Sequence, residues 1–274
     1  MEAESAVAVR RAGRSIPGPD IALFVVLNLV GAGTYLYPFA VQGIHDPGSS
    51  WYEHRGDGPL IMAAVAALGL ALTLSLLTGG RLSSRSLAAL GVLAAMAAVL
   101  RTVTLPAGAN LFFVLVIGGG WVFGARLGFL LGALGFVLSA IVTGGLGPWL
   151  PFQVFAAGWV GLTAGLVGPT LGARLSPRLE VALVVLFGFA WGIAFGAILN
   201  LWFWPFWAGG TDLTFEPSAG LGDNLRHYWN FYLVASAGWD LMRALFNAAA
   251  LALLARPLLR ALRRFHDRFE WSMY

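Results

Sequence analysis

Residues 127–161, "LGFLLGALGFVLSAIVTGGLGPWLPFQVFAAGWVG", decide what kind of protein this chain is. Residues 127–145 carry no charge, and they are about as long as the ~20 apolar residues that cross a bilayer. A Gly- and Pro-rich turn follows, with Pro148 at the expected start of a second apolar run. The stretch therefore predicts two membrane-crossing helices joined by a short turn.

The composition extends this prediction to the whole chain. Of 274 residues, 58% are hydrophobic and only 11% are charged, whereas soluble domains carry about 25% charged residues. Long continuous apolar runs also exclude an outer-membrane barrel, whose strands alternate. There is no Cys, which excludes disulfides, thiolate metal sites and a thiol nucleophile. The predicted fold class is an all-α polytopic membrane protein.

Eight apolar segments are long enough to be considered as spans. They comprise residues 21–44, 59–79, 86–105, 109–124, 127–145, 149–171, 179–204 and 228–255. The fourth is short and contains the triplet Gly118-Gly119-Gly120, so we expect it to be broken or strongly tilted.

The arginines orient these spans. All 17 basic residues are Arg, and 13 of them fall on one side when the N-terminus is placed inside. This agrees with the positive-inside rule and predicts that both termini are cytoplasmic. The first segment lacks a convincing cleavage site, so we expect an uncleaved helix. The basic, aromatic tail 256–274 favours a helix lying on anionic lipid, with a solvated tail as the alternative.

Aromatic and amide side chains gather in the outer half of the last three spans. Trp149 suits an interfacial aromatic belt, but Gln153 lies one turn further inside on the same face and needs hydrogen-bond partners there. Trp159 is too deep for such a belt. Aromatic walls with a few fixed polar groups are typical of ligand sites. The predicted substrate-binding residues are Asn110, Trp149, Gln153, Trp159, Asn200, Asn230, Asp240 and Arg243.

Three of these polar positions also have structural interpretations. Asn110 stands at an outer helix end, where it could cap the helix or contact a ligand. Asp240 and Arg243 are three residues apart deep in a span, so they form either a buried ion pair or the floor of the site. Arg101 either snorkels to the interface or reaches a bound anionic group.

Several function classes lack their motifs. There is no phosphate-binding P-loop, no His pair at metal-ligand spacing and no nucleophile elbow, so we expect no catalytic residues, no metal and no cofactor. The net charge of +4 marks the cytoplasmic side rather than a nucleic-acid partner. Two alternatives stay open: a stand-alone secondary transporter that uses Asp240 for proton coupling, and, less favoured, an intramembrane enzyme acting on a lipid.

Small residues four apart mark two rows on the third segment. Ala94 and Ala98 form one row, and Gly91 and Ala95 form the other. Such rows let another helix approach closely, either within the chain or from a partner subunit.

Residues 93–101, "LAAMAAVLR", and residues 110–166 resemble the substrate-binding S component of energy-coupling factor (ECF) vitamin transporters. The resemblance covers residues 86–255. It implies a six-helix core that holds a vitamin near the outer face, with a transmembrane coupling subunit and two ATPase subunits as partners. It also implies that Ala94 and Ala98, which match the family's Ala-x-x-x-Ala row, dock on the coupling subunit. The two extra helices in residues 21–79 depart from the family pattern.

The resemblance completes the expected organisation. Residues 1–20 form a cytoplasmic segment, 21–80 two additional helices, 86–255 the substrate-binding core and 256–274 the cytoplasmic tail. The segment "GPWLPFQ" and the abundance of Trp resemble cobalamin-type and related actinobacterial members. Cobalamin or another corrinoid is therefore the first expected ligand, ahead of a thiamine precursor or a queuosine-type base. The expected location is the plasma membrane of a bacterium.

Overall fold

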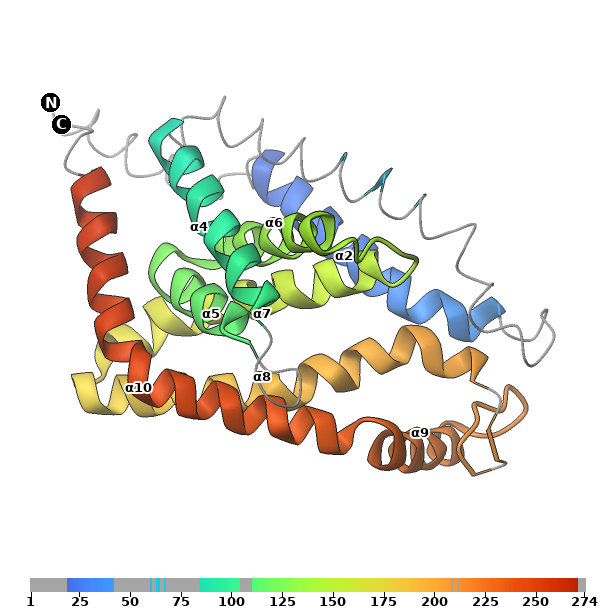
Figure 1. Cartoon of the computed structure of the whole chain (residues 1–274). Coiled ribbons are helices and arrows are strands. Elements are labelled where there is room, and N and C mark those ends of the chain that lie inside the picture. The colour runs from blue at the N-terminus through green and yellow to red at the C-terminus, as the bar shows by residue number, and fades with distance from the viewer. Residues whose placement is uncertain are drawn as a thin grey trace, which may run out of the picture.

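A computed structural model describes residues 19–41, 84–103, 110–207, 209–210 and 212–270, together with positions 60, 63, 64 and 67. All regular structure in these residues is helical, as predicted (Figure 1). The helices are α2 (Pro19–Val41), α4 (Ser84–Thr102), α5 (Phe112–Phe123), α6 (Ala125–Thr143), α7 (Leu150–Thr170), α8 (Pro177–Phe203), α9 (Leu221–Ala235) and α10 (Ala237–Glu270). Residues 1–18, the loop 45–58 and most of the second expected span lie outside the described residues.

The chain is a multi-pass membrane protein. Four helical stretches in the described residues are long and apolar enough to cross a bilayer: Ala125–Thr143, Leu150–Arg174, Pro177–Phe206 and Ala237–Asp267. Three shorter apolar helices accompany them, at Ile21–Leu36, Ser86–Thr102 and Phe112–Phe123. The spans predicted within 86–204 end within about three residues of these helices, because Gly- and Pro-rich turns separate them.

The eighth predicted span, 228–255, is wrong as a single helix. Its first residues belong to α9, the chain breaks at Ser236, and α10 starts at Ala237. Figure 1 shows α9 almost end-on beside the lengthwise α10, so the two helices point in different directions. The Ser236 hydroxyl donates to Asp240 Oδ2 one turn into α10, and such local bonds let serine interrupt or begin helices.

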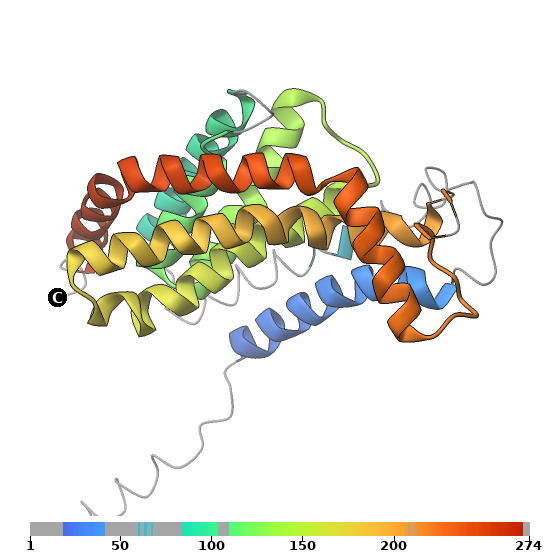
Figure 2. The same ribbon diagram turned by 90° about the horizontal axis from the view of Figure 1, so that it is seen from below.

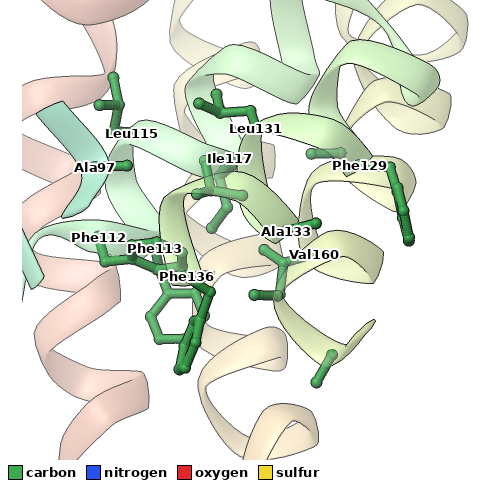
Figure 3. Packing of buried hydrophobic residues seen from close by; sticks show 14 of the residues in the cluster. Ala97, Phe112, Phe113, Leu115, Ile117, Phe129, Leu131, Ala133, Phe136 and Val160 are labelled. Atoms are coloured by element: carbon green, nitrogen blue, oxygen red, sulfur yellow. The ribbon is translucent and has the colours of Figure 1, made fainter. Parts of the chain in front are cut away.

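The glycine triplet does not break its helix. α5 runs unbroken through Gly118, Gly119 and Gly120, which corrects the prediction of a broken segment. These glycines admit neighbours instead, since an added Cβ at Gly119 would collide with Leu131 and one at Gly120 with the Gly161 carbonyl. α5 is therefore a central helix, with most of its residues buried from Phe112 to Trp121 (Figure 3).

Small residues also set two close helix crossings. In the α6–α7 pair, Gly128 and Gly161 meet backbone to backbone, so neither position has room for a side chain. In the α8–α10 pair, Gly192 packs on Ala244 and Gly196 on Asp240, and Figure 2 shows these two helices lying alongside each other. Close backbone approach is how helices associate where lipid removes the hydrophobic incentive.

The additional helix α2 packs on the core. An added Cβ at Gly31 would overlap the Phe155 ring, so α2 lies directly against α7. The Tyr35 hydroxyl donates to the Phe152 carbonyl at 2.6 Å, and their rings meet edge to face. Figures 1 and 2 place α2 on the opposite side of α7 and α8 from α10.

The C-terminal tail continues α10 as far as Glu270, with Pro257 inside the helix. A proline there removes a backbone hydrogen bond and bends the helix. Figure 1 shows the last part of α10 turning away from the direction of the rest. The tail is thus helical over its described part, as the juxtamembrane prediction requires.

Candidate functional site

Gln153 lies on the interior face of α7 near the outer end. Ala156, Val160 and Ala164 follow it at helical spacing on the same face, and all three are fully buried. Gln153 itself is only half-buried, and its side chain makes no hydrogen bond within the described part of the chain. An accessible amide above a closed apolar floor can donate to and accept from a ligand.

Two other predicted residues serve local structure beside Gln153. The Asn110 side-chain oxygen accepts from the backbone N–H of Phe112, the first residue of α5, at 3.2 Å, although the N-cap position itself belongs to Leu111. Trp149 donates through Nε1 to the Gly145 carbonyl at 3.3 Å, which fixes its ring over the α6–α7 turn. Both side chains are half-buried at the outer end of the fold.

Asn200, Asp240 and Arg243 come together in one polar network, joined through Ser236. Asn200 donates to the Ser236 hydroxyl at 2.6 Å, and Ser236 donates to Asp240. Arg243 donates to Asp240 Oδ1 at 2.6 Å and to the Gly192 carbonyl at 3.3 Å. Asp240 is 1% exposed. The ion pair expected from the three-residue spacing is therefore present, at the break between α9 and α10.

Trp159 faces α2. Its Nε1 donates to Asn28 Oδ1 at 2.9 Å, and its ring packs beside Tyr35 at 5.5 Å. Gln153 lies on a different face of α7, toward the bundle interior. The structure therefore does not bring Trp159 and Gln153 together. Trp159 instead contacts the additional helix α2.

The helix α9 covers the outer end of α8. Its Tyr228 hydroxyl donates to the Ala197 carbonyl, and the Tyr228 ring packs on Trp204 at 5.0 Å. Asn224 and His227 are buried and bond the preceding loop, at Glu216 and Thr214. Within the described residues, the Asn230 side chain donates to the Asp212 carbonyl, at 3.5 Å. Much of the predicted aromatic wall thus packs α8, α9 and this loop against each other.

Arg101 points into the bundle. Its guanidinium lies 3.9 Å from the centre of the Phe136 ring and donates to the Ser139 hydroxyl at 2.7 Å. It makes no ion pair with a carboxylate in the part of the chain that the structure describes. The contacts with α6 show that Arg101 does not simply snorkel outward.

An ion-pair cluster that sequence reasoning missed lies at the inner end. Glu180, at the start of α8, is buried and accepts from Trp121 Nε1 at 2.9 Å. Arg263 on the tail of α10 forms a two-pronged salt bridge with the same carboxylate. Glu180 and Arg263 are 83 residues apart in the sequence, so no local pattern pairs them. The only hint was that a single acid and a basic helix were both expected at the cytoplasmic side.

The two small rows on α4 differ in exposure. Ala94 and Ala98, the predicted docking residues, are 0% and 3% exposed and face α6, where Gly135 lies against Ala94 and Ala97. Gly91 and Ala95 are exposed. In this conformation Gly91 and Ala95 are accessible to a partner helix, whereas Ala94 and Ala98 are covered by α6. The docking role of Ala94 and Ala98 stays a prediction.

A comparison with protein families finds a match over most of the chain. The family model described as "ECF transporter, substrate-specific component" matches residues 85–255. No curated protein and no solved structure matches the chain. Among the described residues, no group of three or more His, Cys, Asp or Glu side chains is placed to hold a metal ion.

Proposed function

Since the chain belongs to the substrate-specific components of ECF transporters, we propose that it binds a vitamin or related micronutrient at the outer face of a bacterial plasma membrane. The family match over residues 85–255 carries this proposal. Such components work with a membrane-embedded coupling subunit and ATPases, which are the partners we assign here. Cobalamin or another corrinoid is the first ligand to test, followed by a thiamine precursor.

The proposed site is centred on Gln153. Asn110 and Trp149 lie at the same outer end, and Asn230 belongs to the helix that covers it. The network of Asn200, Asp240 and Arg243 forms its rim at the α9–α10 break. Trp159 contributes indirectly, by anchoring α2 to the helix that carries Gln153.

The proposed docking surface for the coupling subunit is the exposed face of α4. Gly91 and Ala95 supply the small residues that close helix approach requires. Ala94 and Ala98 contribute indirectly, because they pack α4 against α6 and so position this exposed face.

Mass spectrometry of small molecules that co-purify with the chain tests the proposal. Recovery of a vitamin, followed by titration against the chain's 11 tryptophans by fluorescence, would identify the ligand. Gln153→Ala should weaken binding about two- to tenfold, the value of one neutral hydrogen bond. Thr170→Ala, exposed at the inner end of the same helix, is the control and should leave affinity unchanged. No co-purified molecule and no binding across a vitamin panel would refute the proposal.

Proton-coupled transport through Asp240 is the competing function. The ion pair with Arg243 gives this carboxylate a structural role that needs no protonation cycle. Uptake measured without the coupling subunit and ATPases separates the two, because an S component delivers its ligand only with those partners. Uptake that needs no ATPase and is lost in Asp240→Asn would favour the secondary transporter.

A further inference from the structure

A groove between α4 and the tail of α10 lies apart from the proposed ligand site. Its volume is about 510 Å³, within the range of ~300–1,000 Å³ typical of ligand pockets. Only apolar side chains line it: Ala88, Ala89, Val92, Leu93 and Met96 from α4, and Ala261, Leu262 and Phe265 from α10. We propose that this groove binds one anionic phospholipid of the inner leaflet.

The length of the groove suits one acyl chain. Ala88 and Met96 are eight residues apart, and at 1.5 Å per residue the α4 wall is about 12 Å long. An acyl chain that spans half of a ~30 Å hydrocarbon core is about 15 Å long. By the arginine distribution α4 starts at the cytoplasmic side, so the groove lies on the inner-leaflet side of the fold and its wall can contact most of one acyl chain.

The bend of α10 forms the second wall. After Pro257 the tail turns beside the inner end of α4, as Figure 1 shows. Leu259 and Leu262 are buried, while Val92 and Met96 on the opposite wall are 60% and 50% exposed. The salt bridge from Arg263 to Glu180 holds the tail in this position.

The charge at the mouth of the groove selects an anionic headgroup. Arg264 adjoins Phe265, is exposed, and makes no ion pair with a described carboxylate. An apolar groove with an exposed arginine beside its cytoplasmic end suits a lipid that has a phosphate and a net negative charge.

Native mass spectrometry of the purified full-length chain tests the proposal, with added phosphatidylglycerol or phosphatidylcholine of the same acyl chains. The wild type should retain one phosphatidylglycerol more tightly than phosphatidylcholine. Val92→Trp fills the groove and should lower retention of phosphatidylglycerol at least tenfold. Arg264→Gln should weaken phosphatidylglycerol about fivefold, equivalent to ~1 kcal/mol for one basic residue, and leave phosphatidylcholine unchanged.

Arg256→Gln is the matched control, because Arg256 is exposed on the same helix before the bend. It should bind both lipids as the wild type does. Equal retention of the two lipids by the wild type, or equal losses in Arg264→Gln and Arg256→Gln, would overturn the proposal. If Val92→Trp blocks assembly with the coupling subunit but keeps wild-type lipid binding, the groove is a protein contact and the lipid assignment fails. Arg264→Gln, a surface change, keeps the test decisive if Val92→Trp does not fold.

Discussion

Gly161→Ala should destabilise the fold, although helix propensity alone predicts that it stabilises α7. The added Cβ would lie far inside van der Waals contact with the Gly128 carbonyl, and a backbone oxygen cannot rotate away as a side chain could. Overpacking typically costs ~1–3 kcal/mol, and the immovable neighbour favours the upper end. Alanine gains back ~1 kcal/mol of helix propensity. The expected net loss is therefore about 2 kcal/mol.

Gly91→Ala is the matched control. An added Cβ at Gly91 meets no atom within 4 Å, so only the propensity gain of about 0.5–1 kcal/mol remains. Thermal unfolding in detergent, followed by tryptophan fluorescence, compares both variants with the wild type. At ~2–4 °C per kcal/mol, Gly161→Ala should lower Tm by about 4–8 °C, while Gly91→Ala should raise it slightly. A Gly161→Ala protein as stable as Gly91→Ala would refute the assigned α6–α7 crossing.

Three further predictions concern polar contacts between helices. Glu180→Gln should lower the unfolding free energy by ~1–3 kcal/mol, because Arg263 loses its charged acceptor; the Glu180→Gln/Arg263→Gln double variant measures the coupling, and strictly additive effects would contradict the salt bridge. Asn28→Leu and Trp159→Phe should each cost about 1 kcal/mol but less than the sum together, and additivity would show that α2 is not anchored there. Asp240→Asn should lower the unfolding free energy more than Ser236→Ala in the same assay, because it leaves Arg243 without a carboxylate. The reverse order would contradict a stabilising role for the Asp240–Arg243 ion pair.

The sequence predicted the helices well because apolar length and turn residues are local properties. The turn around Gly144 and Pro148 separates α6 from α7 in the printed sequence as clearly as in space. The break at Ser236 could not be found in this way, because the apolar run continues across it. It depends on hydrogen bonds from Ser236 to Asp240 and from Asn200 to Ser236.

The candidate site was harder to predict because the hydrogen-bond partner of a side chain can lie far away in the sequence. The sequence identified Trp159 as a polar-tipped ring too deep for an interfacial belt, but its partner, Asn28, lies 131 residues away. Spacing also revealed both small rows on α4. It could not decide which row faces α6, because the pairs Ala94/Ala98 and Gly91/Ala95 have equal spacing and nearly equal size.

The position of α2 determines how an extra helix can coexist with docking. Tyr35 and Asn28 tie α2 to α7, while α4 packs on α6 and keeps Gly91 and Ala95 exposed. α2 therefore leaves this face of α4 uncovered. Its two hydrogen bonds lie about two helical turns apart and bridge to different turns of α7, so α2 cannot pivot about either one without breaking the other. Under the proposed function, any reorientation of the core that carries a ligand inward must move α2 with it as one body.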